Sequence, residues 1–462
     1  MSFLANGRKR CLLLRNKEVA DLLTAELLTD LKAILPEERI MMDSNPGHYF
    51  GNGGQCHVFP VSEEEISAVL KYANDHRKKV AIEGGGTKRG FGGLTKACDI
   101  LLSLANYKGI VEHTAGDMTL TVKAGTTFKE IQDYLKPYKQ RIALDPALPE
   151  LATIGGIIAA NESGPKRLGY GSARDAVIGL RIVYPDGSVI RTGGKVVKNV
   201  AGYDMNKLFI GAMGTLGVVS EVTVKLRPIA KFESLILISF PNGSDEEIRQ
   251  FVIRLLDSTM EPVSLELLNP SLSARLIGRK HNTVAISLED VESSVYYQEH
   301  YIKSIKPADT DLQVLQQSAA RAFWDQFYAI APNGTRTPDG NSTEAAVKIG
   351  VVNLDVLNVI KESVLLQESY NLKIEAHGGF GHGLCHINLS GGSEDVVAAI
   401  DQLRDYVSNL SGYVVVKHLP FALRQQVDVW GGKPSYFFLL EGIKEKIDPN
   451  RVLNPNRFVG GI

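Results

Sequence analysis

Two short stretches of the chain combine residue types that could do chemistry. The first, EGGGTKRGFGG at residues 83–93, places six glycines in eleven positions directly after a short apolar run. Glycines in series leave consecutive backbone N–H groups unobstructed, and Thr87 adds a hydroxyl donor. A tight turn without a ligand would account for one or two of these glycines, but not for five of them. We therefore predict that this backbone contacts a bound anion.

Two common phosphate-binding motifs do not fit this loop. A Walker A loop ends in Gly-Lys followed by Ser or Thr, but here Thr87 precedes Lys88. A dinucleotide-binding loop needs a glycine where Arg89 stands and a helix that begins at once, whereas the strand-like DILLSL follows at residues 99–104. The P-loop and Rossmann classes are therefore disfavoured.

The second stretch is AHGGFGHGLCHIN at residues 376–388, which holds His377, His382 and His386. Three histidines so close together could bind zinc, but no carboxylate is nearby in the sequence. The alternative is that they line a polar cleft or pack in a sheet. We expect His382 and His386 to share one strand face, and we predict no metal.

Composition narrows the class of protein. Lys and Arg number 51 and Asp and Glu 52 in 462 residues, so no net field favours nucleic acid or an anionic membrane. The four cysteines (Cys11, Cys56, Cys98 and Cys385) lack the spacing of zinc or iron–sulfur sites and are typical of reduced thiols. The apolar run of RKRCLLLR is too short for a signal peptide, and no 18-residue apolar stretch exists. We expect a cytoplasmic protein without a transmembrane segment.

The first half of the chain predicts mixed α and β elements that position the glycine loop. Residues 16–35 favour a helix, and Ser62 with Glu65 forms a capping box ahead of a helix with one apolar face. KKVAIE, at residues 78–83, is a predicted strand that leads into the loop. After the strand TLTVKAG, Thr127 and Glu130 cap a further helix, and residues 176–193 predict a hairpin that turns at 185–187.

From about residue 231 the pattern changes to long apolar strands that alternate with capped helices. Two βαβ-like passes, at 233–268 and 345–418, predict a ferredoxin-like antiparallel sheet with helices on one side. We therefore expect four parts: an N-terminal helical extension at 1–45, a first domain at 46–230, an α+β cap domain at 231–440, and a C-terminal segment at 441–462 that returns to the first domain.

Four segments carry a resemblance to a known family: 58–93, 152–164, 170–189 and 211–228. In this order and spacing they resemble the FAD-binding domain of the vanillyl-alcohol oxidase/p-cresol methylhydroxylase superfamily. The closing IDPNRVLNPNRF also resembles that family. KNVAGYDMNKLFIGAMGTLG and QVDVWG are most similar to the FAD-binding subunits of bacterial glycolate oxidases, which are relatives of FAD-linked D-lactate dehydrogenases. The implied fold is α+β, with a two-lobed FAD-binding domain of the p-cresol methylhydroxylase type and the cap domain.

The resemblance implies particular cofactor contacts. Gly84, Gly85, Gly86 and Thr87 would bind the FAD pyrophosphate, and Val218 would lie near the adenine. Covalent FAD attachment in this family often uses a histidine near the first loop, where Lys88 and Arg89 stand here, so we expect non-covalent FAD. The positions implied along the ribityl chain and flavin are Pro149, Thr153, Ile154, Gly155, Gly156, Asn161, Ser163 and Gly164.

The substrate side of the family pattern is altered. Relatives that oxidise 2-hydroxy acids have a strand of the form H-x-G-D-G-N-x-H, in which His386 matches the second histidine and Gly379 replaces the first. His382 falls where the acid would be. These relatives also have a Glu-His pair, which here is Lys417-His418, so His418 matches the catalytic base.

Lys417 would repel a divalent cation at the position where relatives place a metal-binding glutamate. The alternative for Lys417 and His418 is a solvated strand end. Phe327, three residues after a tryptophan, replaces the arginine that binds the substrate carboxylate in relatives, and Arg424 or Arg321 could substitute.

The resemblance implies an FAD-dependent oxidoreductase acting on CH–OH groups. The expected role is the FAD-binding subunit of a complex that oxidises glycolate or D-lactate and passes electrons to a sister flavin subunit and an iron–sulfur subunit. Any attachment to a membrane would be made through these partners. One alternative is a self-sufficient 2-hydroxy-acid dehydrogenase with His418 as base and His382 and His386 orienting the substrate. A flavin-binding structural subunit is the other.

Overall fold

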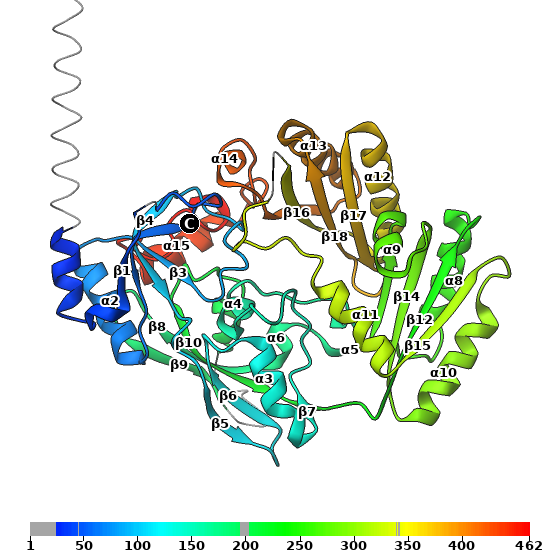
Figure 1. Cartoon of the computed structure of the whole chain (residues 1–462), viewed down its shortest axis with the longest axis horizontal. Coiled ribbons are helices and arrows are strands. Elements are labelled where there is room, and N and C mark those ends of the chain that lie inside the picture. The colour runs from blue at the N-terminus through cyan, green and yellow to red at the C-terminus, as the bar shows by residue number, and fades with distance from the viewer. Residues whose placement is uncertain (1–24, 45, 195–202, 339, 341) are drawn as a thin grey trace, which may run out of the picture.

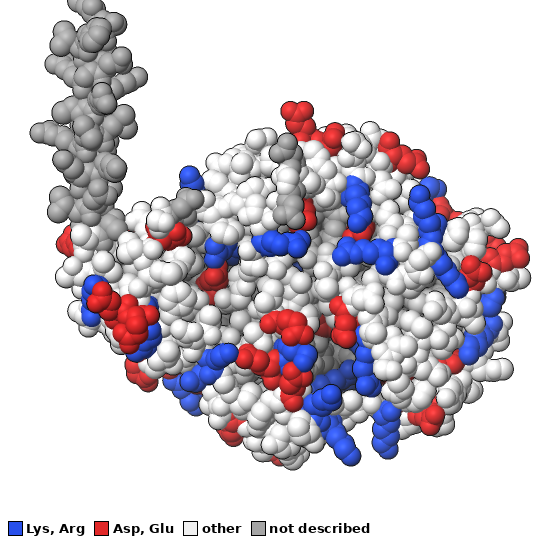
Figure 2. Space-filling view, viewed as in Figure 1, with Lys and Arg blue, Asp and Glu red and all other residues white. Residues whose placement is uncertain are grey.

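The computed structural model describes residues 25–44, 46–194, 203–338, 340 and 342–462. Figure 1 shows two lobes, which we call the first lobe (β1 to β11) and the second lobe (β12 to β19). Residues 25–32 are helical, within the predicted 16–35. The predicted residues 16–24, Cys11, and the KNVAG part of the glycolate-oxidase-like motif lie outside the described residues. Charged side chains of both signs are interspersed over the face in Figure 2, in line with the balanced composition.

The first lobe begins with a four-stranded sheet in the order β1-β2-β4-β3. β2 and β3 run parallel to β4, and β1 pairs antiparallel with β2. Helix α2 buries the apolar face that the sequence predicted, and Ser62 caps it, but Glu65 accepts from the N–H of Val61, so the capping box is incomplete. The elements are β1 (Ile40–Met42), β2 (Gly53–Val58), α2 (Glu63–Asp75), β3 (Val80–Glu83), β4 (Ala97–Ser103) and η1 (Glu37–Arg39).

A second sheet in this lobe is antiparallel, in the order β5-β6-β10-β8-β9. The predicted hairpin is β8 and β9, and the predicted box of Thr127 and Glu130 caps α3. The strands are β5 (Ile110–Thr114), β6 (Thr119–Lys123), β8 (Val177–Val183), β9 (Val189–Gly193) and β10 (Val218–Lys225), with β7 (Gln140–Arg141) paired to β11 (Arg227–Pro228). The helices are α3 (Phe128–Leu135), η2 (Lys136–Tyr138), α4 (Ile154–Ala159), α5 (Arg167–Tyr170), α6 (Ala173–Ala176) and α7 (Asn206–Phe209).

The second lobe is built on one antiparallel eight-stranded sheet, in the order β15-β12-β14-β13-β17-β18-β16-β19. Its strands are β12 (Phe232–Phe240), β13 (Ser264–Leu268), β14 (Asn282–Asp290), β15 (Asp311–Gln316), β16 (Thr343–Gly350), β17 (Leu372–Gly379), β18 (Leu384–Gly391) and β19 (Tyr413–His418). Its helices are α8 (Asp245–Leu256), α9 (Pro270–Ile277), α10 (Glu292–Ile305), α11 (Ser318–Tyr328), η3 (Asn353–Asp355), α12 (Val356–Ser369), α13 (Ser393–Asn409) and α14 (Phe421–Arg424).

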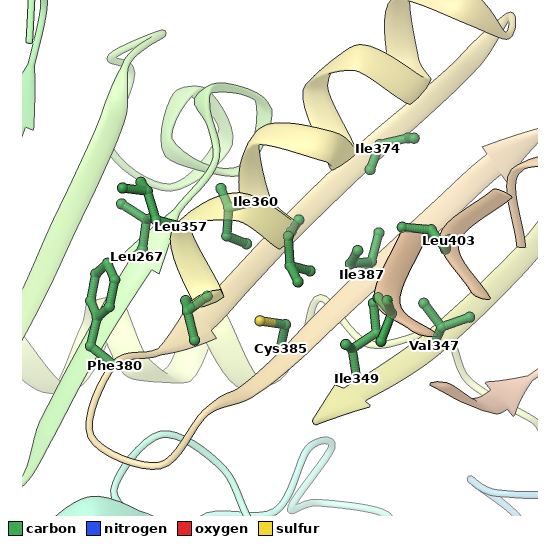
Figure 3. Packing of buried hydrophobic residues seen from close by; sticks show 14 of the residues in the cluster. Leu267, Val347, Ile349, Leu357, Ile360, Ile374, Phe380, Cys385, Ile387 and Leu403 are labelled. Carbon is green, nitrogen blue, oxygen red and sulfur yellow. The ribbon is translucent and has the colours of Figure 1, made fainter. Parts of the chain in front are cut away.

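Helices cover both faces of this sheet, so the prediction of helices on one side was wrong in that respect. α8, α10, α12 and α13 pack on one face; Figure 3 shows Leu357 and Ile360 of α12 and Leu403 of α13 over the strands. α9 and α11 pack on the other face against Leu235 and Leu237. β12 is apolar at consecutive positions, and successive side chains point to opposite faces, so both faces of this part of the sheet must be covered.

The C-terminal segment packs against the first lobe. It consists of α15 (Phe437–Ile447) and η4 (Val459–Gly461) with their connecting residues. Leu453 bridges to Val80 of β3, and Asn454 accepts from the N–H of Ile82 and donates to the carbonyl of Met213. These contacts bring the chain end to the strand that leads into the glycine loop.

Candidate active site

The glycine loop begins where β3 ends at Glu83. A Cβ on Gly84 would overlap the Thr153 hydroxyl and one on Gly85 would overlap the Leu151 carbonyl, while Gly86 has a φ of +71°. Within the described part of the chain, the backbone N–H groups of residues 84–88 donate to no protein acceptor. Glycine is therefore required here by close packing of the chain on itself, and the packing leaves a run of unused donors.

A cleft in the first lobe is lined by this loop, by α4 and by residues 213–219. Thr153 caps α4 and faces Gly84, whereas Ile154 is fully buried in the core. The residues predicted to bind FAD that line the cleft are Gly84, Gly85, Gly86, Thr87, Thr153, Gly155, Gly156 and Val218.

The remaining predicted FAD contacts lie elsewhere. Ser163 and Gly164 line a cavity between the two lobes, Asn161 lines a neighbouring cavity, and Pro149 lies on a separate groove beside α3. The structure thus brings together the residues of the first loop and α4 in one cleft. Asn161, Ser163 and Gly164 instead line cavities that residues of the second lobe also line.

The FAD implied by the resemblance fits the cleft. Consecutive free N–H groups match a pyrophosphate, which accepts several hydrogen bonds at once. At Gly156 a Cβ would meet only Thr153 Oγ1, at 3.3 Å, so the protein leaves this face of α4 uncovered. The charged groups beside the loop are already engaged with protein partners, because Arg89 pairs with Glu83 and Arg457 donates to the Lys88 carbonyl.

The outer half of the glycine loop is held by the second lobe and the chain end. The N–H of Leu419 donates to the Gly90 carbonyl at 3.1 Å, and that of Gly334 donates to the Thr87 carbonyl at 3.0 Å. Thr87 and Lys88 line the cavity between the lobes as well as the cleft. One loop therefore faces both spaces.

The interlobe cavity is lined on its second-lobe side by aromatic, imidazole and lysine side chains. Phe327 lies there, with its ring centroid 4.7 Å from that of His377. On the first-lobe side Lys88 pairs with Glu162. The second-lobe residues include Phe327, Tyr328, His377, His386, Asn388, Lys417 and His418.

The prediction that His382 and His386 share a strand face was wrong, because the stretch 376–388 is a hairpin. β17 ends at Gly379, the N–H groups of His382 and Gly383 donate to the Gly379 carbonyl, and Gly383 has a φ of +69°. His382 therefore lies in the turn. His386 instead faces His377 across β17 and β18, with ring centroids 5.1 Å apart and planes 12° apart.

A buried carboxylate that the sequence did not reveal lies beside these imidazoles. Glu266 of β13 is 1% exposed and accepts a 2.7 Å hydrogen bond from Nδ1 of His377, while Nε2 of His382 is 3.4 Å from its other oxygen. Burial alone would raise the pKa of Glu266, but the two imidazoles hold it below its usual value. The one signal in the sequence was an acid in the middle of the apolar strand PVSLELL.

His418 is buried, and burial together with the nearby Arg424 lowers its pKa to about 3. Its ring packs at 4.5 Å against Phe50, and in the described residues its Nε2 has no hydrogen-bond partner. Lys417 and His418 are consecutive yet line the same cavity, because Lys417 is an extra, unpaired residue of β19 at the register shift between Ala346 and Val347, and this bulge changes the alternation.

Neither arginine proposed as a substrate clamp reaches the cavity. Arg424 donates to the backbone carbonyls of Gly93, Leu419 and Phe50. Arg321 is exposed and pairs with Glu233. Both expectations were wrong, because these guanidinium groups are used within the protein.

The described part of the chain lacks the side-chain arrangement of a metal site. There, no group of three or more His, Cys, Asp or Glu side chains is arranged to hold a metal ion. Cys56, Cys98 and Cys385 are buried free thiols. No helix among these residues is both long and apolar enough to cross a bilayer.

The chain is similar to known proteins in sequence and in fold. Residues 54–193 match the family model described as FAD binding domain. The chain is 27% identical to the glycolate oxidase subunit GlcD of Bacillus subtilis (strain 168), over 87% of this chain and 88% of that protein. It is also 27% identical to the mitochondrial D-lactate dehydrogenase (cytochrome) of Arabidopsis thaliana, over 94% of this chain and 80% of that protein. The structure of p-cresol methylhydroxylase with substrate bound matches with a TM-score of 0.74 at 16% identity, covering 94% of this chain and 96% of that one.

Proposed function

We propose that this chain is a flavoprotein that oxidises a 2-hydroxy acid to a 2-oxo acid. Its residues 54–193 match an FAD-binding domain, and its fold is that of p-cresol methylhydroxylase. The named relatives act on glycolate and D-lactate, which are both 2-hydroxy acids. The observation that carries the proposal is that one loop, at Thr87 and Lys88, lines both the cofactor cleft and the imidazole-lined cavity.

Oxidation of a 2-hydroxy acid requires a base for the hydroxyl proton and an acceptor for the hydride. Bound FAD would supply the hydride acceptor. Among the imidazoles, His377 is the best placed base, because Glu266 accepts its Nδ1–H, fixes its tautomer and would stabilise the imidazolium that forms. His418, with a pKa of about 3, is a weak base and fits better as a neutral wall of the cavity.

Lysines would attract the substrate carboxylate in place of the missing arginine. Lys417 lines the cavity beside His386 and His377. An ammonium group there attracts the substrate carboxylate by charge, but it does not form the bidentate hydrogen bonds of a guanidinium. We assign Lys417 to the carboxylate of the 2-hydroxy acid, and His386, which shares this cavity, to its orientation.

We further propose that this chain is a subunit that transfers the two electrons to partners, as in a complex with a sister flavin subunit and an iron–sulfur subunit. The likeness to a protein named as a glycolate oxidase subunit supports this arrangement. The four cysteines lack iron–sulfur spacing, so a cluster would have to come from another chain.

An anaerobic reduction experiment tests the proposal. Glycolate or D-lactate is added to the purified flavin-loaded chain, and the visible flavin absorption is followed. Bleaching by the chain alone supports a self-sufficient dehydrogenase, and bleaching only with partners supports the subunit role. The proposed oxidation is refuted if the chain purifies without flavin. It is also refuted if no 2-hydroxy acid bleaches the flavin, with or without partners.

A matched pair of variants tests the base. His377→Gln should slow flavin reduction by about 10²- to 10⁴-fold, the usual contribution of a general base. His300→Gln, at an exposed position on α10 of the same lobe, should leave the rate unchanged. Equal rates in both variants would show that His377 is not the base.

A further inference from the structure

A glycine makes room for a second imidazole beside the buried carboxylate of the second lobe. Gly379, the last residue of β17, pairs with Glu266 of β13. A Cβ on Gly379 would overlap the ring of His382 and would also come close to Oε1 of Glu266. The space that a side chain at position 379 would fill is therefore occupied by the His382 imidazole.

The turn that carries His382 is held in place by buried backbone contacts. Phe380 is fully buried in the apolar cluster of Figure 3, and its N–H donates to the Leu265 carbonyl at 3.0 Å. At the other end of the turn, the N–H of Val351 donates to the Gly383 carbonyl at 2.9 Å. The position of the His382 ring is thus fixed from both sides.

The hydrogen bonds of His382 also fix which ring nitrogen carries the proton. The N–H of Leu384 donates to Nδ1 at 3.2 Å, so Nδ1 is an acceptor and the proton of the neutral ring lies on Nε2. Nε2 lies 3.4 Å from Oε1 of Glu266. Among the described residues, neither of these two atoms has another hydrogen-bond partner. His382 therefore faces the carboxylate oxygen that His377 leaves unused.

The other titratable groups around this cluster do not replace His382. On the second-lobe side, β18 contributes His386 and Cys385, and β19 contributes Lys417 and His418. On the side of the first lobe, Lys88 pairs with Glu162, and Asp145 accepts from the hydroxyl of Tyr328 at 3.3 Å. Among the described residues, none of these groups donates a hydrogen bond to Glu266. The charge of Glu266 therefore depends on the two imidazoles.

Loss of the His382 contact would change the state of the carboxylate. Oε1 would be left in a buried position without a donor, and burial favours the neutral form of a carboxyl group. A neutral Glu266 would no longer stabilise the imidazolium that forms when His377 takes the hydroxyl proton. His377 would then be a weaker base.

We propose that His382 is a positioning residue, which keeps Glu266 ionised and aimed at His377 and so sets the strength of the base. The inference rests on the proposed oxidation with His377 as base. His382 is not among the residues that line the interlobe cavity, so it acts through Glu266 and not on the substrate.

The first test measures the carboxylate itself and needs no substrate. The flavin-loaded chain is labelled with carbon-13 at the glutamate side-chain carboxyl carbons, and the NMR signal that Glu266→Gln removes is followed against pH. In the original chain this signal should titrate below the usual range of glutamate. His382→Asn keeps an acceptor for Leu384 but cannot reach Glu266, so it should raise the titration by about one pH unit or more.

Two further variants serve as rescue and control. The longer amide of His382→Gln can place an N–H where Nε2 lies, so it should restore the original titration. His300→Asn, at an exposed position on α10, should leave it unchanged. His382→Met, which also lacks the donor, is measured beside His382→Asn so that the test does not depend on the folding of one variant.

The second test follows the rate of flavin reduction by a 2-hydroxy acid against pH. His382→Asn should lower the maximal rate by about tenfold, because a weaker base transfers the proton less readily. Its acid limb should move to lower pH by about one unit, because the imidazolium has lost its counter-charge. His382→Gln should match the original chain in both respects.

The outcomes separate this inference from the function on which it rests. If Glu266 titrates alike in the original chain, His382→Asn and His382→Met, the inference is overturned whether or not the acid is oxidised. If Glu266 titrates higher in these variants but the acid limb does not move, control of the base is overturned. If no 2-hydroxy acid reduces the flavin, the oxidation fails and the role in catalysis is overturned with it. A raised titration that His382→Gln reverses would still support control of Glu266 by His382.

Discussion

Replacing Gly156 tests whether the cleft in the first lobe holds FAD. Gly156 lies in α4, where a Cβ would meet only Thr153 Oγ1, at 3.3 Å. The branched side chain of Gly156→Val would therefore extend into the cleft with little contact to the protein. Substituting Gly85 is a poorer test, because its Cβ would overlap the Leu151 carbonyl and disturb the loop even without a ligand.

The expected size of the effect follows from overfilling a packed site. Such overfilling costs about 1–3 kcal/mol. FAD binding should therefore weaken by roughly 5- to 150-fold, since about 1.4 kcal/mol corresponds to a factor of ten. The fold itself should not suffer, because valine is a better helix former than glycine by a few tenths of a kcal/mol.

The assay is a titration of flavin-free protein with FAD, followed by flavin fluorescence, with thermal unfolding measured on the same samples. Gly442→Val is the matched control, because Gly442 is exposed in α15 and a Cβ there meets no atom within 4 Å. The reasoning is refuted if Gly156→Val binds FAD as tightly as the original chain. It is also refuted if Gly442→Val weakens binding to the same extent.

Two further predictions concern charged groups. Burial lowers the pKa of Lys417 to about 8, so this lysine is mostly charged at pH 7 and loses its proton as the pH rises above 8. The apparent dissociation constant of the acid substrate should therefore rise above pH 8, by up to about tenfold per pH unit, and a flat profile from pH 7 to 10 would contradict this. Separately, Lys444 is 1% exposed and bonds to Asp448 at 2.6 Å and to the Thr215 carbonyl at 2.7 Å. Lys444→Met should lower the free energy of unfolding by about 3–5 kcal/mol in denaturant titrations, because it leaves a buried carboxylate unpaired, whereas the exposed Lys446→Met should change it by less than about 0.5 kcal/mol.

The parts of the fold that depend on local chemistry could be predicted from the sequence. The apolar face of α2, the cap at Thr127 and the turn at 185–187 follow from residues within a few positions of one another. The glycine loop was also placed correctly between a strand and a second strand, because glycine and apolar periodicity are local signals.

The parts of the candidate site that depend on strand order could not be predicted. Glu266 meets His377 because β13 pairs with β17, although the two residues are 111 positions apart. His382 was misplaced because the glycines of its segment form a turn rather than continue a strand. His418 points into the cavity through a bulge in the β16–β19 pairing, which depends on both strands.

The hydrogen bonds to the carbonyls of Thr87 and Gly90 make the conformation of the cofactor-binding loop depend on residues of the second lobe. The loop belongs to the first lobe in sequence, but its outer half is completed by Gly334 and Leu419, and by Arg457 near the chain end. A fragment cut at residue 230 would keep the glycines and lose these three supports. The smallest unit able to form this site is therefore larger than the stretch that carries its recognisable motif.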